Sequence, residues 1–289
     1  MRNVKEVLEE ITSWAKENPD IRTVLLVGSR ADPDAKVDLL SDYDIEIAVN
    51  DPRKFLDSEE WLSAFGDPLV IMQVNEDFKL RMVIYKDYIR IDFRIYLVED
   101  FKQIITQTKL PKNLDNGYKI LLDKDGITLN LKTPAYDVFI ITKPSKEEFL
   151  AALTDFWWDT TYVAKSLWRD EIFYAKYMLD SIIRFSYLRK IIEWHISAQY
   201  NWGITTNKYG RFFKHYLDVE TGEELEKTFA GSEKEENWNA LFATLKLLRR
   251  LAMTISQEID CSYPEELDAE ISSYLNKIKT LDKSATDIN

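Results

Sequence analysis

Apolar positions in the first half of the chain switch between the spacing of strands and that of helices. Residues 3–17 repeat apolar side chains every three or four positions, which predicts an amphipathic helix. Short apolar runs and two-residue alternation predict four strands, at 21–27, 43–49, 80–85 and 88–97. Two more helices are expected at 52–65 and about 98–107. This half therefore predicts strands that alternate with helices.

The pattern changes near residues 142–145, after which nearly every apolar position has helical spacing. Ser145 followed by Glu148 resembles a capping box at the start of a long helix. Further helices are predicted at about 170–200, 207–217, 234–260 and 264–281. We therefore expect two domains, residues 1–143 and residues 144–289.

Two short motifs follow the predicted strand 21–27 closely in the sequence: Gly28-Ser29, and Asp42 with Asp44. Gly28 and Ser29 follow this strand, and a glycine there lets the backbone approach an anion, while the next amides can form an anion-binding nest. Asp42 and Asp44 stand two apart, so their carboxylates leave one face of the next strand. Such carboxylates repel unless a cation lies between them, and Mg²⁺ prefers carboxylate and phosphate oxygens. The pattern predicts a site for a metal–nucleoside triphosphate.

A third aspartate lies in the predicted strand 88–97. Asp92 is on the polar face of that strand, between Arg90 and Arg94. If this strand neighbours the strand 43–49, Asp92 comes within reach of the other two aspartates. It would then complete the ligand set of a second metal ion or accept the proton of an attacking hydroxyl, and both roles stay open.

Charge and composition indicate which kind of partner the protein binds. The chain has 289 residues and a net charge of -12, with 20 basic and 26 acidic residues in 1–144 and 18 and 24 in 145–289. Neither half has the basic excess that is typical of nucleic-acid binding, so we expect a small cationic partner and no nucleic acid. No apolar run approaches a membrane span and no apolar signal core opens the chain. With a single cysteine, Cys261, we expect a cytoplasmic protein with no membrane partner and no cysteine-ligated zinc.

The spacing Gly28-Ser29-x12-Asp42-x-Asp44 resembles the signature of the nucleotidyltransferases related to DNA polymerase beta. Longer segments resemble the streptomycin (aminoglycoside) 6-adenylyltransferases, among them Gly-Ser-Arg at 28–30, Ser-Asp-Tyr-Asp at 41–44, Arg-Ile-Asp-Phe at 90–93, Asp-Phe-Trp-Trp at 155–158 and Tyr-Val-Ala-Lys at 162–165. The similarity extends from about residue 5 to residue 281.

This resemblance implies an α+β fold, with an N-terminal mixed-sheet nucleotidyltransferase domain followed by a C-terminal helical-bundle domain. It also implies an activity: transfer of AMP from Mg²⁺-ATP to a hydroxyl of an aminoglycoside-like cationic acceptor, of the streptomycin 6-position type, with release of pyrophosphate. By matching positions, Asp42, Asp44 and Asp92 would be the catalytic residues and the Mg²⁺ ligands.

Further residues are predicted to contact the two substrates. Asp155 and Asp159 lie four apart on one helix face, where they would receive a guanidino or amino group of the acceptor. Trp157 and Trp158 point about 100° apart, so at most one of them contacts a ligand, and Trp157 is taken as that residue. The predicted contacts of the nucleotide are Gly28, Ser29, Arg30, Lys165, Lys208 and Arg211.

The chain departs from the family pattern at a few positions. It has Val27 before the Gly-Ser pair where glutamate is common, Asp155 where the family has glutamate, and Asn207 where the family has glycine. Asparagine can adopt the left-handed backbone that glycine would. Arg94 replaces a smaller residue.

Other functions with the same catalytic core stay open. They are an RNA nucleotidyltransferase, a protein-AMPylating nucleotidyltransferase and a non-catalytic nucleotide-binding module. The even charge of the two halves argues against RNA, and the three aspartates argue against a non-catalytic module. We expect a monomer in preference to an oligomer.

Overall fold

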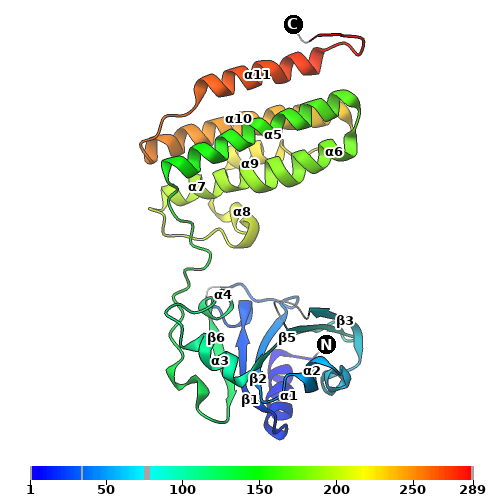
Figure 1. The fold of residues 1–289 in the computed structure, drawn as a ribbon, viewed down its shortest axis with the longest axis vertical. Helices are drawn as coiled ribbons and strands as arrows, with labels where there is room; N and C mark the ends of the chain where they lie inside the picture. Colours follow the sequence, from blue (N-terminus) through cyan, green and yellow to red (C-terminus); the bar gives the residue numbers. More distant parts are fainter. Residues whose placement is uncertain (1, 34, 75–78, 288–289) are drawn as a thin grey trace. The chain divides into compact units, whose positions relative to one another are not determined.

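A computed structural model describes residues 2–33, 35–74 and 79–287 of the chain (Figure 1). The chain divides into two compact units, Met1–Val138 and Phe139–Asn289, which we call the sheet unit and the helical unit. This division lies a few residues before the boundary that the sequence pattern predicted. None of the helices in the described ranges combines the length and the apolarity that a membrane span requires.

The described part of the sheet unit forms a six-stranded sheet in the order β3-β4-β5-β2-β1-β6. Strands β2 and β5 pair in parallel, and the other four neighbouring pairs are antiparallel, so the sheet is mixed as the resemblance implied. The four predicted strands are present, and β3 and β6 at the two edges were not predicted. The strands are β1 (Ile21–Val27), β2 (Tyr43–Val49), β3 (Pro68–Val74), β4 (Leu80–Tyr85), β5 (Arg90–Leu97) and β6 (Tyr118–Asp123).

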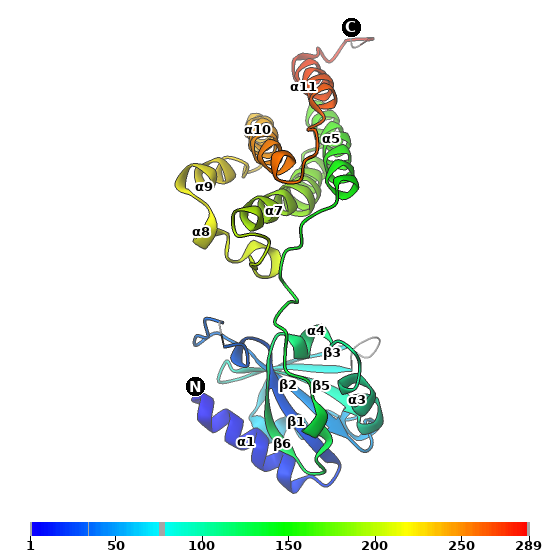
Figure 2. The same ribbon diagram turned by 90° about the vertical axis from the view of Figure 1, so that its left-hand side faces the viewer.

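Helices cover both faces of this sheet, with α1 (Val4–Glu17) on one side and α3 (Val98–Ile105) on the other (Figure 2). Apolar side chains of α1 pack on alternate residues of β1, β2 and β5, and those of α3 pack on the opposite alternation. The shorter helices and turns are η1 (Gly28–Arg30), α2 (Arg53–Leu56), η2 (Glu60–Phe65), α4 (Lys112–Asp115) and η3 (Ile127–Asn130).

The prediction of one helix over 52–65 is wrong. The segment is the short helix α2 followed by the 3₁₀ helix η2. Ser58 lies between them, and its hydroxyl accepts a hydrogen bond from the Glu60 amide (3.2 Å), an alternative to helical bonding that serine often provides. The apolar residues Phe55, Leu62 and Phe65 are still buried, which explains the helix-like spacing.

The helical unit has one apolar core, contributed by its longer helices. Helix α5 begins after Ser145, whose side chain accepts a hydrogen bond from the Glu148 amide (3.1 Å). In Figure 1, α5, α10 and α11 run alongside one another. The helices are α5 (Lys146–Arg169), α6 (Ile172–Lys176), the π-helix η4 (Tyr177–Leu188), α7 (Arg189–Gln199), α8 (Phe213–Tyr216), α9 (Val219–Glu226), α10 (Lys234–Glu258) and α11 (Glu265–Thr280).

Of two helix predictions in this unit, one is confirmed and one is wrong. The helix predicted at about 170–200 is present as the uninterrupted run of α6, η4 and α7, whose middle part is π-helical. The predicted helix at 207–217 is wrong: a turn, η5 (Lys208–Gly210), precedes the one-turn helix α8. Positive φ angles at Asn207, Tyr209 and Gly210 are incompatible with a regular helix there.

Candidate active site

The turn after β1 places its backbone directly beside Asp44. Val27 pairs with Asp44 across β1 and β2, and the chain then turns at Gly28, whose φ is 68°. A Cβ at Gly28 would overlap the Asp44 carboxylate and lie 2.9 Å from its Cγ. Only glycine therefore allows the turn and the carboxylate to occupy this space together.

The parallel pairing of β2 and β5 brings the predicted aspartates together. Asp44 is the direct partner of Asp92 in the register, so the condition that the sequence left open, that these strands are neighbours, is met. Asp42 immediately precedes β2, one alternation before Asp44. Three carboxylates thus lie at one end of two adjacent strands, beside the Gly28–Ser29 turn.

Arg90 lies between two of these carboxylates. Its Nε and one Nη donate to the two oxygens of Asp92, at 2.9 and 2.7 Å, and its other Nη is 3.4 Å from Asp42 Oδ2. The Asp92 side chain is 12% exposed and that of Arg90 is 40% exposed. The guanidinium group therefore bridges Asp42 and Asp92 as a shared counter-ion.

Burial and mutual repulsion disfavour the charged form of these acids. Burial, followed by the charges of Asp92 and Asp42, raises the pKa of Asp44 to about 6. Burial also raises the pKa of Asp42, although the Arg90 charge opposes this. No side chain in the described ranges forms a hydrogen bond or ion pair with Asp44. A cation at this carboxylate would relieve both effects.

Glu46 is a fourth acid on the same strand face, and it was not singled out from the sequence. Its side chain is 2% exposed, one oxygen accepts a hydrogen bond from Asn113, and Arg94 lies 3.9 Å away. The other oxygen has no partner in the described part of the chain, and burial raises the pKa of Glu46 to about 7. Its position two residues after Asp44 was the available signal, because strand alternation assigns both to one face.

Arg30 holds the loop that leads to Asp42. Its guanidinium donates to the carbonyl oxygens of Asp42 (3.0 Å) and Ser41 (2.7 Å) and lies over the Tyr43 ring at 4.0 Å. Lys119, from β6, donates to the Arg30 carbonyl at 2.8 Å. Arg30 is buried, so its evident role is to position the turn, and its predicted contact with the nucleotide stays a prediction.

The type of ligand at this site suits a divalent cation, because carboxylate oxygens gather there and the Arg90 guanidinium already lies between two of the carboxylates. Within residues 2–33, 35–74 and 79–287, no set of three or more His, Cys, Asp or Glu side chains is arranged so that it could hold a metal ion. Metal binding by Asp42, Asp44 and Asp92 therefore stays a prediction.

The predicted acceptor residues lie on α5 in the helical unit. Asp155 is exposed and Asp159 is half-buried, and the Tyr187 hydroxyl donates to Asp159 Oδ2 at 2.8 Å. Burial and then this hydrogen bond raise the pKa of Tyr187, so the phenol keeps its proton. Tyr187 was not predicted, since nothing in its local sequence distinguishes it from other aromatic residues of the unit.

The assignment of Trp157 to the acceptor is corrected. Trp157 is fully buried in the core of the helical unit, where its ring packs edge-on against Phe156 at 5.2 Å. Trp158 is 66% exposed. The sequence predicted that the two indoles point apart, and the apolar neighbours of α5 determine which one is covered.

Three of the four predicted cationic contacts of the nucleotide also lie in the helical unit. Lys165 is half-buried with its Nζ over the Tyr162 ring at 4.4 Å, and Lys208 and Arg211 are exposed beside the turn η5. Asn207 has a φ of 60°, so asparagine does adopt the positive φ that glycine would favour. Contact of these cations with a triphosphate stays a prediction.

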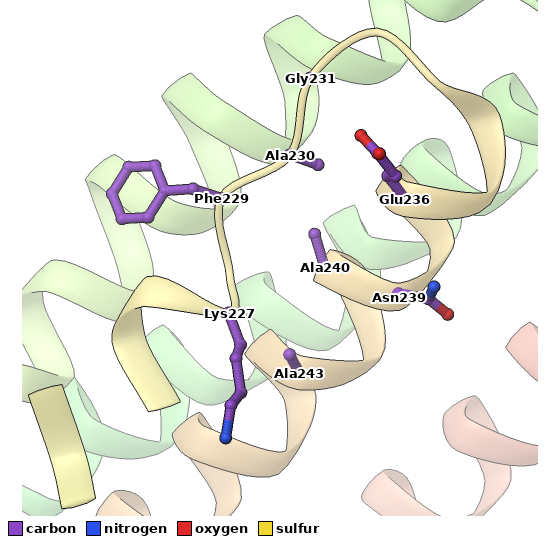
Figure 3. Close-up of a pocket in the computed structure, with 8 residues that line it drawn as sticks. All are labelled: Lys227, Phe229, Ala230, Gly231, Glu236, Asn239, Ala240 and Ala243. Carbon is purple, nitrogen blue, oxygen red and sulfur yellow. The ribbon is translucent and has the colours of Figure 1, made fainter. Parts of the chain in front are cut away.

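A separate hollow of about 660 Å³ lies beside the segment that follows α9 (Figure 3). Figure 3 shows Phe229 and Ala230 pointing to opposite sides of this segment. None of the predicted site residues is among those that line the hollow, which are Lys227, Phe229, Ala230, Gly231, Glu236, Asn239, Ala240 and Ala243. It is therefore not part of the candidate active site.

Each of the following comparisons with known proteins matches nearly the whole chain. A family model described as streptomycin adenylyltransferase matches residues 1–278. The aminoglycoside 6-adenylyltransferase of Bacillus subtilis (strain 168) is 30% identical over 288 residues, covering 96% of this chain and 98% of the relative. That of Campylobacter jejuni is 31% identical over 286 residues, covering 96% of each. A crystal structure of an aminoglycoside 6-adenyltransferase from Bacillus subtilis aligns with a TM-score of 0.48 and 24% identity, covering 97% of this chain and 100% of that one.

Proposed function

The chain belongs to the streptomycin adenylyltransferase family, and we propose that it transfers AMP from Mg²⁺-ATP to a hydroxyl of an aminoglycoside-like cationic acceptor, of the streptomycin 6-position type. The acceptor oxygen forms a bond to the α-phosphorus, the bond from that phosphorus to the bridging oxygen of the β-phosphate breaks, and the hydroxyl proton passes to water. The products are an AMP ester and pyrophosphate. The observation that carries the proposal is the pairing of Asp44 with Asp92 beside the Gly28 turn.

The residues of the sheet unit divide the work on ATP. Gly28 and Ser29 offer a close backbone approach for the triphosphate, and Arg30 keeps the Asp42 backbone in place beside them. Asp42, Asp44 and Asp92 would hold Mg²⁺, which when bound would neutralise phosphate charge in the transition state. The raised pKa of Asp44, about 6, leaves this carboxyl mostly ionised at pH 7.5 and ready for a cation.

We propose that Asp92 acts as a ligand and orienting group rather than as the base. Both of its oxygens accept hydrogen bonds from Arg90 in this structure, and the same oxygens would be metal ligands when Mg²⁺ is bound, so they are engaged in either case and not free to take a proton. We expect Asp92→Asn to lose activity by a similar factor at every pH between about 6 and 9.5, because the missing function is not proton removal. The measurement is kcat by pyrophosphate release at saturating Mg²⁺. A variant rate that climbs towards the parent's at high pH would assign base catalysis to Asp92.

The helical unit supports the choice of a cationic acceptor. Asp155 and Asp159 share a face of α5, and the Tyr187 hydroxyl donates to Asp159. Two carboxylates and a phenol suit the ammonium, guanidino and hydroxyl groups of an aminoglycoside. The acidic balance of the chain favours such a partner over nucleic acid.

The decisive experiment is incubation with labelled ATP, Mg²⁺ and a panel of aminoglycosides, with pyrophosphate and the labelled drug as readouts. An RNA and a protein mixture are added in separate arms, and Asp44→Asn serves as the inactive control. We expect labelling of an aminoglycoside by the parent alone. Labelling only of RNA or protein would overturn the proposed acceptor, and release of no pyrophosphate in any arm would overturn the proposed reaction. Light scattering in the same buffer tests the expected monomer.

A further inference from the structure

Arg90 occupies the position that a cation would take between two of the predicted metal ligands. All three nitrogens of its guanidinium face carboxylates: two bond to Asp92 at 2.9 and 2.7 Å, and the third is 3.4 Å from Asp42. Asp44, the strand neighbour of Asp92, shares the same site without an ion-pair partner in the described ranges. Arg90 thus contacts two carboxylates of a cluster of three.

The same oxygens cannot serve the guanidinium and a divalent cation in full. Each oxygen of Asp92 uses one of its two lone pairs to accept a charge-assisted hydrogen bond from Arg90, at 2.9 and 2.7 Å. An inner-sphere Mg²⁺ at about 2.1 Å would draw on the negative charge of the same oxygens and brings twice the charge of the guanidinium. Binding of the cation at Asp42 and Asp92 therefore weakens both contacts with Arg90.

Arg90 has room to leave. A cavity of about 430 Å³ borders it on one side and is lined by Arg90, Asp42, Ser41, Tyr88 and the apolar side chains Leu39 and Leu40, among others. Asp92 is almost covered, whereas Arg90 is 40% exposed, so the arginine is the partner that can move into solvent. Its stem carries several rotatable bonds, and the strand backbone of β5 need not change.

We propose that Arg90 is a built-in counter-cation that holds Asp42 and Asp92 until a divalent metal displaces it. This inference rests on the proposed metal site. It assigns Arg90 two positions: bridging the carboxylates without metal, and released from them when the metal is bound. In the first position the arginine reduces the repulsion among the carboxylates and holds Asp42 and Asp92 in place for the metal. In the second, its positive charge becomes available beside the anionic nucleotide.

The test measures binding of Mn²⁺ to the full chain at pH 8 without nucleotide, by electron paramagnetic resonance of free Mn²⁺. We expect Arg90→Gln to bind Mn²⁺ about fivefold more tightly than the parent, because one partly exposed ion pair no longer competes. Arg94→Gln is the matched control: it removes the same charge from the same strand face, two residues further on, beside Glu46 (3.9 Å). We expect this control to change the affinity by less than about twofold.

The outcomes separate this inference from the proposed function. Equal tightening in both variants would reduce the effect to general electrostatics and overturn the inference, as would an unchanged or weaker affinity in Arg90→Gln. Failure of the parent to bind Mn²⁺ at a site that Asp44→Asn abolishes would overturn the metal site as well. If Arg90→Gln does not fold, the Nε–H resonance of Arg90 in the parent decides, assigned by its absence in Arg90→Lys. We expect it to shift on addition of Mg²⁺, and no shift overturns the inference.

Discussion

The two groups of acids in this protein are held in different ways. Asp44 and Asp92 lie in register on parallel strands, and Arg90 clamps Asp92 and reaches Asp42. Asp155 and Asp159, in contrast, stand on one helix, and the hydrogen bond from Tyr187 to Asp159 joins only one of them to another helix. We call Asp42, Asp44 and Asp92 the strand group and Asp155 and Asp159 the helix group. Backbone pairing fixes the position of the strand group, whereas the exposure of the helix group depends on which side of α5 the neighbouring helices leave uncovered.

This difference suits the two tasks of a nucleotidyl transfer. Phosphoryl chemistry requires groups held within about half an ångström of the productive geometry, and the pairing of β2 with β5 together with Arg90 holds the strand group in this way. Recognition of a flexible polycation tolerates more movement and depends on charge. We therefore expect substitutions in the strand group to lower kcat and substitutions in the helix group to raise the KM of the acceptor.

The largest expected effect tests which side of α5 is covered. Trp157→Ala removes a fully buried indole from the core of the helical unit, and we expect it to lower the free energy of unfolding by about 3–5 kcal/mol. Trp158→Ala, the matched change one residue later at a 66% exposed side chain, should stay within about 0.5 kcal/mol. Urea unfolding followed by circular dichroism at 222 nm measures both. Equal losses in the two variants would mean that the wrong indole has been placed in the core.

The second prediction tests the strand group. Asp44→Asn should lower kcat by about a hundredfold or more, on the order of 3 kcal/mol of transition-state stabilisation, because a neutral amide is a poor partner for a cation at the phosphates. The fold should survive, since the change removes one of three crowded charges. Asp67→Asn, at an exposed acid of the same unit, is the control. Near-parental turnover of Asp44→Asn with Mg²⁺ would remove Asp44 from the site.

The strand group could be predicted because its pattern is local. Gly28, Asp42 and Asp44 are close in sequence, and two-residue alternation alone assigns the carboxylates to one face. The pairing of β2 with β5 could only be stated as a condition, because it joins residues almost fifty positions apart and no local pattern specifies it.

The helix group was harder to predict. Helical spacing correctly separated Trp157 from Trp158, but which indole is buried depends on α6, η4 and the other neighbours of α5. The contact of Tyr187 with Asp159 joins two helices in the same way. The turn at η5 was missed because the apolar residues Phe212, Phe213 and Tyr216 have helical spacing although φ is positive just before them.

The third prediction concerns the pH dependence of stability. Burial raises the pKa of Glu46 to about 7 in the folded chain, above its unfolded value of about 4.3. The folded state therefore binds more protons between these values, so stability from this group is present below about pH 4 and is lost as pH rises through 7. Glu46→Gln does not titrate and still accepts the hydrogen bond of Asn113. In EDTA, its stability relative to the parent should increase by on the order of 2 kcal/mol from pH 5 to pH 8.

Glu60→Gln, at an exposed glutamate of the same unit, is the control for that measurement and should show no such trend. Urea unfolding at both pH values gives the two differences. A constant difference between Glu46→Gln and the parent would mean that Glu46 is charged in the folded state throughout this range.

The smallest expected effect tests the helix group. Asp155→Asn should raise the KM of a cationic acceptor about tenfold while the KM of ATP and kcat change by less than about twofold, because it removes one exposed charge without disturbing the strands. Added salt should raise the parent's acceptor KM more steeply than the variant's, since an exposed charge pair is screened and the variant has one pair fewer.

Glu147→Gln, which neutralises another exposed acid of α5, controls for net charge and should leave both KM values near the parent's. Initial rates at varied acceptor and ATP concentrations, at about 50 and 300 mM salt, provide all these comparisons. Equal changes in the two KM values of Asp155→Asn would move this residue from the acceptor to the nucleotide or to the fold. An effect as large in Glu147→Gln would show that overall charge, rather than the face shared with Asp159, attracts the acceptor.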